Sequence, residues 1–461
     1  MSLIKSISGI RGTIGGRPGD GLSGVDVVKF TAAYAQFLKN RGVDSNIVVV
    51  GRDARLSGEM VRDLVCGGLV AMGFDVVDLG LSTTPTVEIA VVEEKAAGGI
   101  IITASHNPMQ WNALKLLDSN GEFLSDLDGR EVLRIASEED YVFAEVTQLG
   151  NVEKNDTYIR KHIELVKKLP LVDVEAIRNA NFRVAVDAVN STGGIAIPAL
   201  LRALGVKDIV ELNCEPTGRF AHTPEPIPEN LGQISGLMKN GMADVGFVVD
   251  PDVDRLAIVM ENGEMFVEEY TLVSVADYIL SKTPGPTVSN LSSSRALGDV
   301  TRAHGCEYNA AAVGEVNVVA KMRETGAVIG GEGNGGVIYP ELHYGRDALV
   351  GVALFLTLLA KSGKKVSELK AGYPQYVIAK SKIELTPDLD VDAILLAMKK
   401  RFANEKVTDI DGVKIDFADG WVHLRKSNTE PIIRIYSEAG SEREAVRLAD
   451  EIRKIVKEIA E

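Results

Sequence analysis

Short apolar runs recur along most of the chain, and each is followed by a polar loop and then by residues with helical spacing. The clearest runs are 47–50, 184–186 and 287–290. Short apolar runs bounded by turn residues are typical of buried strands. Their irregular spacing excludes a solenoid of stacked repeats. The pattern therefore predicts three α/β domains, in which ligand-binding loops follow the carboxyl ends of strands.

The C-terminal part of the chain has a different pattern. Strand-like segments at 420–424 and 432–436 flank a polar loop. A capping box formed by Ser441 and Glu444 then predicts the start of a helix. Apolar residues continue at helical spacing: Ala445, Leu448, Ile452, Ile455 and Val456. We expect a smaller α+β domain that swings over a cleft.

The length of the chain, 461 residues, is too great for a single hydrophobic core. Polar stretches at 149–157 and 362–368, together with a point near Arg255, divide it into segments. The predicted fold class is α/β, with three similar α/β mixed-sheet domains and a smaller C-terminal α+β domain around a central cleft. The expected domains are 1–150, 151–255, 256–366 and 367–461.

The composition is that of an ordinary globular protein, with 45% hydrophobic and 25% charged residues. Its apolar runs are too short to span a membrane, and Met1–Gly12 lacks the layout of a signal peptide. We therefore expect a cytoplasmic protein with no membrane partner. Cys66, Cys214 and Cys306 are too few and too far apart for a disulfide framework or a zinc site. We expect them to be buried apolar residues.

The formal net charge is −15 at pH 7. Broad nucleic-acid binding depends on neutralising phosphates, so this charge argues against a nucleic-acid partner. An anionic small substrate is compatible with it only where basic residues are concentrated locally.

Thr103–Pro108 follows the apolar run 99–102 and places Ser105 in a loop at the end of a predicted strand. A serine hydroxyl is a weak nucleophile and needs a base, a metal or positive charge nearby. His106 and Lys115 are candidates for this activation. A plain turn is the competing interpretation, because Asn and Pro commonly form turns.

Asp250, Asp252 and Asp254 lie between two apolar runs. In an extended loop, side chains at alternate positions point to one side, so the three carboxylates can converge on a hard divalent cation. The same spacing opens an EF-hand calcium loop, but Arg255 stands where that loop needs a glycine. A solvated acidic hairpin is the alternative.

Two later loops carry groups suited to sugars and phosphates. Gly330–Gly336 follows the apolar run 327–329, and its Glu332 and Asn334 can hydrogen-bond hydroxyl groups. Arg425–Pro431 joins the two C-terminal strand-like segments, and its polar residues, flanked by arginines, can cradle a phosphate dianion. A glycine hairpin and a charged hairpin without chemical roles are the alternatives.

These motifs together resemble those of the α-D-phosphohexomutases, the superfamily of phosphoglucomutase, phosphomannomutase and phosphoglucosamine mutase. They stand in the family's order and cover essentially the whole chain. The motifs are Ser8–Gly12, Gly51–Gly58, Thr103–Pro108, Asp250–Arg255, Gly331–Gly335 and Arg425–Pro431. The serine and aspartate motifs are highly specific, whereas the first motif and the glycine loop only add support.

The resemblance implies a role for each candidate site residue. Ser105 would carry a phosphoryl group. One Mg²⁺ per chain would be bound by an oxygen of that phosphate and by Asp250, Asp252 and Asp254. The residues that surround the phosphoryl group and move protons would be Arg11, His106, Lys115 and Arg255. Glu332 and Asn334 would bind the sugar. The loop that holds the non-reacting phosphate would contribute Arg425, Ser427, Asn428, Thr429 and Arg434.

Two positions depart from the better-known pattern. The bacterial phosphomannomutase-like loop usually reads Glu-x-Ser-Gly, whereas this chain has Glu332-Gly333-Asn334-Gly335, which is similar to archaeal-type mutases. This difference leaves the identity of the hexose open. Ala113 stands where glycine is common, a change that should leave Lys115 in place.

The resemblance implies reversible isomerisation of hexose 1-phosphate and hexose 6-phosphate, through a phosphoserine and a bisphosphorylated sugar. Glucosamine phosphate is the favoured substrate, and mannose or glucose phosphate is the alternative. The expected activator is glucose 1,6-bisphosphate or a similar bisphosphate, and we expect a monomer or a homodimer. A metal-dependent sugar phosphatase and a non-catalytic sugar-phosphate sensor are the alternatives from other functional classes.

Overall fold

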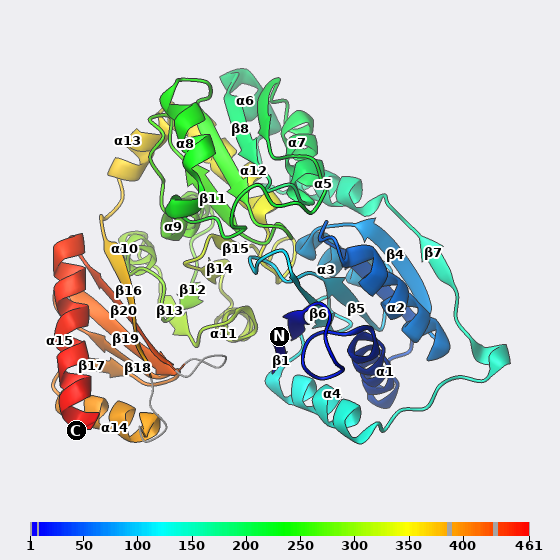
Figure 1. Ribbon diagram of the computed structural model, residues 1–461. Coiled ribbons are helices and arrows are strands. Elements are labelled where there is room, and N and C mark those ends of the chain that lie inside the picture. Colours follow the sequence, from blue (N-terminus) through cyan, green and yellow to red (C-terminus); the bar gives the residue numbers. More distant parts are fainter. Residues whose placement is uncertain (1, 7–8, 385–389, 427–431, 461) are drawn as a thin grey trace. The chain divides into compact units, whose positions relative to one another are not determined.

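The computed structural model describes residues 2–6, 9–384, 390–426 and 432–460. Contacts between residues divide the chain into two compact units. The first unit consists of Met1–Tyr278 and Asn334–Leu369, and the second consists of Ile279–Gly333 and Lys370–Glu461. Both units combine helices with strands (Figure 1).

The first unit begins with a mixed sheet whose described strands lie in the order β1-β2-β6-β5-β3-β4-β7. The pairs among β3, β4, β5 and β7 are parallel, and the pairs β5–β6, β6–β2 and β2–β1 are antiparallel. The strands are β1 (Leu3–Ser6), β2 (Gly9–Thr13), β3 (Ile47–Arg52), β4 (Asp75–Leu81), β5 (Gly98–Ile102), β6 (Trp111–Leu117) and β7 (Val152–Lys154).

Helices cover both faces of this sheet, because successive strand residues point to opposite faces. In β3, Val48 and Val50 join the apolar core formed with α1, α2 and α4, whereas Val49 joins the core formed with α3. The helices are α1 (Gly24–Arg41), α2 (Gly58–Ala71), α3 (Thr84–Glu93), α4 (Asp126–Glu138) and the 3-10 turn η1 (Val146–Gln148).

A second sheet of the first unit has the strand order β11-β10-β8-β9 in the described residues. Its strands are β8 (Arg183–Asp187), β9 (Asp208–Leu212), β10 (Val245–Val249) and β11 (Leu256–Val259), and only the β10–β11 pair is antiparallel. One face packs on Ile234 and Met238 of α8. The helices of this segment are α5 (Tyr158–Lys168), α6 (Val174–Ala180), α7 (Gly193–Ala203), η2 (Pro228–Asn230) and α8 (Gly232–Lys239).

The second unit contains three parallel neighbours, in the order β13-β12-β14 over the described residues. These are β12 (Thr287–Asn290), β13 (Tyr308–Ala311) and β14 (Ile329–Glu332), with α10 (Ala296–Ala303) and α11 (Glu315–Thr325). β15 (Gly336–Ile338) and α12 (Ala348–Ser362) belong to the first unit, and α9 (Glu268–Leu280) and α13 (Val366–Ala371) span the points of division.

β14 begins later than the apolar run 327–329 predicts and extends into the glycine loop. Its Gly330 packs closely against α11, since a Cβ atom at this position would lie 2.4 Å from Met322 Sδ. Gly330 therefore serves the contact between strand and helix, rather than only a loop around a ligand.

The rest of the second unit is an antiparallel sheet whose described strands lie in the order β16-β20-β19-β18-β17. The strands are β16 (Val377–Glu384), β17 (Lys406–Thr408), β18 (Val413–Asp416), β19 (Gly420–Lys426) and β20 (Ile432–Ala439). The helices α14 (Val391–Arg401) and α15 (Glu442–Ala460) pack on it. The predicted capping contact is present, because the Glu444 N–H donates to Ser441 Oγ at 3.4 Å.

The predicted fold class is confirmed, with α/β segments followed by a C-terminal α+β segment. The cysteine expectation is only partly correct. Cys66 is buried, whereas Cys214 and Cys306 lie in half-buried positions outside the helices and strands. No helix among the described residues combines the length and the apolar character needed to cross a membrane.

Candidate active site

Ser105 lies in the loop between β5 and β6. Its side chain is buried and its φ is +47°, in the left-handed region that is unfavourable for a residue with a Cβ atom. The Ser105 N–H donates to Thr103 Oγ1 at 2.9 Å, and the Thr103 hydroxyl donates to Asp53 Oδ2 at 2.7 Å. The loop conformation is therefore held by polar contacts on the N-terminal side of the serine.

The aspartate loop joins β10 to β11 as a tight turn and not as the extended loop that we expected. Val253 has a φ of +64°, and its N–H donates to the carbonyl oxygen of Asp250 at 3.1 Å. The backbone N–H groups of Asp254 and Arg255 donate to Asp250 Oδ1 at 3.2 and 3.1 Å. The carboxylates therefore converge because the backbone curls around Asp250, and not because residues alternate along a strand.

The serine and aspartate loops meet in the first unit. The Ser105 hydroxyl donates to Asp250 Oδ2 at 2.7 Å. Asp250, Asp252 and Asp254 are fully buried, unlike the aspartates of a solvated hairpin, and one oxygen from each lies within 4.8 Å of the others. The structure thus brings together the predicted nucleophile and the three predicted metal ligands.

The aspartate cluster has the donor atoms that a divalent cation requires. Lys115 Nζ lies 2.7 Å from Asp252 Oδ2, which also accepts the Thr84 hydroxyl at 2.6 Å, and Arg346 Nη2 lies 2.6 Å from Asp254 Oδ2. The opposite oxygens, Oδ1 of Asp252 and Oδ1 of Asp254, are buried without a hydrogen-bond partner among the described residues. Arg255 Nε lies 3.9 Å from Asp254 Oδ1, too far for a hydrogen bond. Buried carboxylate oxygens without hydrogen bonds are costly, and Mg²⁺ prefers oxygen ligands, so these residues fit a magnesium ion.

The protonation equilibria of the aspartates differ. Burial raises the pKa of Asp250 well above its usual range, and the charges of Asp254 and Asp252 raise it further. Burial also acts to raise the pKa of Asp252, but the charge of Lys115 and the hydrogen bonds from Lys115, Thr84 and Asp250 together outweigh burial and hold that pKa below its usual range. Asp250 and Asp252 therefore ionise over different pH ranges although they belong to one cluster.

The β2–β6 pair places Arg11 near Lys115. Arg11 is the register partner of Ala113, two residues before Lys115 on β6. Burial lowers the pKa of Arg11 and Arg255 lowers it further, whereas Asp252 raises it. Arg11 and Arg255 are therefore close enough for their positive charges to interact.

His106 follows the predicted nucleophile directly. Its pKa is lowered to about 2, first by the positive charge of Arg255, then by burial, with a smaller contribution from Arg11. The ring is therefore neutral near pH 7. His106 Nδ1 is buried, and within the described residues it has no hydrogen-bond partner.

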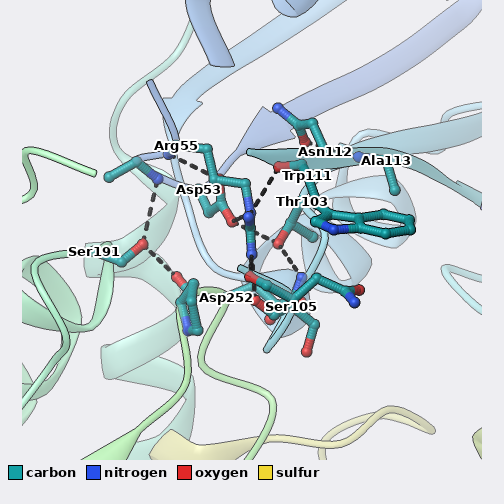
Figure 2. A network of polar contacts seen from close by, with 12 residues as sticks. Asp53, Arg55, Thr103, Ser105, Trp111, Asn112, Ala113, Ser191 and Asp252 are labelled. Carbon is teal, nitrogen blue, oxygen red and sulfur yellow. Dashed lines mark hydrogen bonds and ion pairs between the residues drawn. The ribbon is translucent and has the colours of Figure 1, made fainter. Parts of the chain in front are cut away.

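Several residues that position these groups were not assigned roles from the sequence. Asp53 and Arg55 belong to the Gly51–Gly58 motif, and they lie at the centre of the polar network around Ser105 (Figure 2). Thr84 and Arg346, which contact the aspartate cluster, lie outside all the motifs. No sequence signal identifies them, because each is defined by a contact with a residue far along the chain.

A second group of buried titratable residues was also not predicted. His162 Nε2 and His343 Nε2 both donate to Asp347 Oδ2, at 2.8 and 3.1 Å, and His343 Nδ1 lies 3.2 Å from Glu88 Oε2. Burial lowers the pKa of His343, but the hydrogen bonds to Asp347 and Glu88 raise it more, to about 10. Although these atoms lie within metal-binding reach of one another, both imidazoles donate to the carboxylate. We therefore interpret the group as an ion network that joins α3, α5 and the start of α12.

The two predicted sugar-binding residues fall in different units. In the second unit, Glu332 is buried at the end of β14, where its Oε1 accepts from Asn290 Nδ2 at 2.8 Å and from the Gly314 N–H at 3.2 Å. In the first unit, Asn334 Oδ1 accepts the N–H of Gly336 at 3.1 Å.

The predicted phosphate-holding arginines lie side by side on the C-terminal sheet. Arg425 on β19 is the register partner of Arg434 on β20. Arg425 Nη2 lies 3.1 Å from Asp411 Oδ2, which also accepts the N–H of Val313 at 3.0 Å. The other predicted members of this loop lie outside the described residues: Ser427, Asn428 and Thr429.

Family models match the chain over four consecutive segments. They describe phosphoglucomutase/phosphomannomutase alpha/beta/alpha domain I over residues 3–142, domain II over 156–263, domain III over 268–376 and the C-terminal domain over 384–455. The chain belongs to the α-D-phosphohexomutase superfamily. The predicted family and enzyme class are confirmed, since phosphohexomutases are isomerases that transfer a phosphoryl group within the substrate.

Individual relatives agree with this assignment. A phosphoglucomutase/phosphomannomutase of Thermococcus kodakarensis is 39% identical over 91% of each chain. A probable phosphoglucosamine mutase of Methanopyrus kandleri is 34% identical over the whole of both chains. The crystal structure of a phosphoglucomutase/phosphomannomutase family protein from Burkholderia thailandensis matches with a TM-score of 0.85 at 29% identity, covering 99% of this chain and 98% of that chain.

Proposed function

We propose that this phosphohexomutase interconverts hexose 1-phosphate and hexose 6-phosphate through a phosphoserine at Ser105 and a bisphosphorylated sugar. The observation that carries the proposal is the 2.7 Å hydrogen bond between Ser105 Oγ and Asp250 Oδ2, in a buried site that also holds Lys115. A nucleophile, a cluster of hard oxygen ligands and a cation are the parts that phosphoryl transfer requires.

We propose Asp250, Asp252, Asp254 and an oxygen of the Ser105 phosphate as the ligands of one Mg²⁺ per chain. When bound, the ion would neutralise charge on the transferring phosphoryl group. The Oδ1 atoms of Asp252 and Asp254, which have no hydrogen-bond partner among the described residues, support this ligand set. Lys115 and Thr84 hold the other oxygen of Asp252, which fixes the orientation of its carboxylate.

The proposed phosphoryl transfer exchanges one phosphoryl group and one proton between Ser105 and a sugar hydroxyl, and the chain supplies the groups that this exchange needs. The oxygen of the sugar hydroxyl forms a bond to phosphorus as the bond from phosphorus to Ser105 Oγ breaks. The hydroxyl proton leaves the sugar and ends on Ser105 Oγ, and the neutral ring of His106 is the proposed carrier. Arg11, Lys115 and Arg255 would stabilise the charge on the phosphoryl oxygens.

The other end of the sugar needs its own binding groups. We propose that Glu332 and Asn334 bind sugar hydroxyls, and that the non-reacting phosphate is held by Arg425, Ser427, Asn428, Thr429 and Arg434. The bisphosphorylated sugar then turns, so that its second phosphoryl group returns to Ser105. A bisphosphate released before this step leaves Ser105 without its phosphate, so glucose 1,6-bisphosphate or a similar bisphosphate is the proposed activator.

We favour glucosamine phosphate as the substrate, because the chain carries the Glu332-Gly333-Asn334-Gly335 loop and resembles a full-length relative named a probable phosphoglucosamine mutase. We also propose four domains near the expected divisions 1–150, 151–255, 256–366 and 367–461. The first two reach at least Lys154 and Val259, since β7 and β11 pair into their sheets.

The replacement Ser105→Ala tests the phosphoserine. We expect one phosphate on the wild type by intact-mass measurement and none on the variant, and a loss of mutase rate of at least about 1,000-fold. Ser137→Ala, at an exposed serine of α4, is the matched control and should keep both the phosphate and the rate. A Ser105→Ala rate within tenfold of wild type would exclude the phosphoserine route.

A substrate panel tests the sugar separately. The 1-phosphates of glucosamine, N-acetylglucosamine, mannose and glucose are compared by kcat/KM for formation of the 6-phosphate. The highest value for glucosamine 1-phosphate supports the proposed substrate, and the highest value for another sugar overturns it while leaving the mutase class intact. Release of free phosphate without any 6-phosphate would indicate a phosphatase instead.

A further inference from the structure

We propose that Arg55 is a positioning residue that fixes the Ser105 loop and sets the distance between Ser105 and the aspartate cluster. This inference rests on the proposed phosphoserine function. It concerns a residue that has no hydrogen bond to the three aspartates or to the proposed sugar-binding residues, and that acts on Ser105 through the backbone of the loop.

The guanidinium group of Arg55 is fully buried, and all five of its N–H donors are used within the described residues. Its Nε donates to Asp53 Oδ2 at 3.0 Å. The four remaining donors bind backbone carbonyl oxygens of one short segment (Figure 2). These acceptors are Ser105 O at 2.5 Å, Asn107 O at 2.8 Å, Pro108 O at 2.9 Å and Trp111 O at 2.9 Å.

Carbonyl oxygens gathered in this way repel one another unless a cation lies between them. Their convergence on a planar guanidinium therefore ties the shape of the loop to Arg55. A lysine at the same position offers three donors on a single nitrogen and cannot reproduce the fork. Arg55 is thus required as an arginine, and not only as a positive charge.

The Asp53–Arg55 pair controls both peptide groups of Ser105. On the N-terminal side, Asp53 binds the Thr103 hydroxyl, whose oxygen accepts the Ser105 N–H. On the C-terminal side, Arg55 binds the Ser105 carbonyl oxygen. Between these two anchors, Ser105 has its positive φ of +47°. Such strained conformations persist where the surroundings fix them from several sides, as they do here.

The segment that forms the second sheet, β8 to β11, also contacts the chain between Asp53 and Arg55. The N–H of Ala54 donates to Ser191 Oγ at 3.3 Å, and the Ser191 hydroxyl donates to Pro251 O, inside the aspartate loop, at 2.7 Å. Ser191 therefore links the residue next to Arg55 with the loop that carries Asp250. Through this link, the segment that shapes the Ser105 loop is also tied to the metal-ligand loop.

A loop of the same segment, which contains Gly218 and Phe220, packs against Arg55 and Ala54. The guanidinium carbon of Arg55 lies 5.1 Å from the centre of the Phe220 ring, within the range of a cation–π contact. Gly218 passes so close that a Cβ atom there would lie 1.9 Å from the carbonyl oxygen of Ala54. Water is thus kept from the guanidinium, and its hydrogen bonds act in a low-dielectric setting.

The test compares Arg55→Lys with the wild type and with Arg62→Lys, a control in which a half-buried arginine pairs with Asp78 and does not contact the Ser105 loop. Each protein is first phosphorylated with glucose 1,6-bisphosphate. The measurements are kcat and KM for the hexose 1-phosphate, the melting temperature, and the ³¹P NMR signal of the phosphoserine. A displacement of about 1 Å in a reacting group lowers rates by about 100-fold.

We expect Arg55→Lys to lower kcat by about 100-fold with KM within threefold, and to shift or broaden the phosphoserine signal. Arg62→Lys should keep the wild-type kcat and signal. A kcat for Arg55→Lys within threefold of wild type, with an unchanged signal, overturns the inference. The inference is also overturned if Arg55→Lys and Arg62→Lys lower kcat in the same proportion to the fall in their melting temperatures. Arg55 would then only stabilise the fold.

Ser191→Ala is the second variant, and it keeps the proposal testable if Arg55→Lys does not fold. It removes one hydroxyl together with its hydrogen bonds to the Ala54 N–H and to Pro251 O. It should lower kcat by at least about tenfold, since a single hydrogen bond contributes about 1 kcal/mol. Unchanged kcat in this variant contradicts the proposed link between the two loops. A wild-type protein that accepts no phosphate and has no mutase rate refutes the proposed function itself, which is distinct from the failure of Arg55 alone.

Discussion

Lys115 allows a quantitative test of how the chain tolerates three buried aspartates. Replacement by Met keeps an apolar stem but removes an ammonium group 2.7 Å from Asp252 Oδ2 and 3.5 Å from Asp254 Oδ2. Removing one partner of a buried ion pair costs about 3–5 kcal/mol. Arg346 still pairs with Asp254 in the variant. We therefore expect the free energy of unfolding to fall by the lower end of this range, about 3 kcal/mol.

An exposed lysine provides the matched control. Lys361 lies 3.0 Å from Asp173, but the two side chains are 42% and 37% exposed. Exposed pairs contribute about 0–1 kcal/mol because water screens them. Lys361→Met should therefore lower the free energy of unfolding by less than about 1 kcal/mol. The difference between the two variants measures the effect of burial rather than of losing a charge.

Mg²⁺ should restore much of the stability that the Lys115→Met variant loses. A cation that binds only the folded state adds about 2.7 kcal/mol at a concentration 100 times its Kd. Since Lys115→Met makes the aspartate cluster more negative, Mg²⁺ should stabilise this variant at least as strongly as the wild type. The Lys361→Met variant should respond to Mg²⁺ as the wild type does.

The assay is urea denaturation in EDTA and in saturating Mg²⁺. It is followed by hydrogen–deuterium exchange in peptides from β5 and β6, which report on the first unit alone. The reasoning is refuted if Lys115→Met and Lys361→Met lose equal stability in EDTA. It is also refuted if Mg²⁺ leaves the unfolding midpoint of Lys115→Met unchanged.

Three further predictions address the ligands and the pH dependence. Asp252→Asn should lower the mutase rate by about 100-fold, and EDTA should inactivate the wild type reversibly; full activity after exhaustive chelation would exclude the metal role. Arg425→Lys should raise KM for the hexose 1-phosphate about tenfold, with partial rescue by glucose 1,6-bisphosphate, and an unchanged KM would contradict the phosphate-holding role. The folded-state pKa of His343, about 10, lies above its ordinary value of 6.5, so its stabilising effect is complete below pH 6.5 and is lost as the pH rises through 10. The urea midpoint of the wild type should therefore fall more steeply between pH 7 and 10 than that of His343→Gln, and parallel curves would contradict the role of His343.

The sequence predicted most reliably those features that are local. Ser105 and the aspartate loop each follow a buried strand, β5 and β10, because an apolar run ends there and polar residues begin. Periodicity alone could not bring the two loops together, since Ser105 and Asp250 are 145 residues apart. Only the resemblance to a family related them before the structure did.

The features that were missed depend on backbone groups or on close packing. Arg55 stands in a motif that the sequence makes visible, but four of its five hydrogen bonds go to carbonyl oxygens, which have no signature in the sequence. The compact turn around Asp250 depends on the positive φ of Val253, a conformation that β-branched residues rarely adopt. Gly330 was interpreted as a loop residue, although it is required for packing against Met322.

The pairing of the basic residues explains how a chain with a net charge of −15 can take an anionic substrate. Lys115 pairs with Asp252, and Arg425 pairs with Asp411, so these cations are held by carboxylates of the chain itself. A phosphate group can bind them only by competing with those carboxylates. A cation bound to Asp252 would weaken the ion pair between Asp252 and Lys115. It would therefore favour binding of the phosphate to Lys115. By thermodynamic linkage, the phosphate must favour the cation to the same degree. With the proposed ligand set, the buried aspartates would do more than supply metal ligands, because they would make the positive charge available at this site depend on the metal.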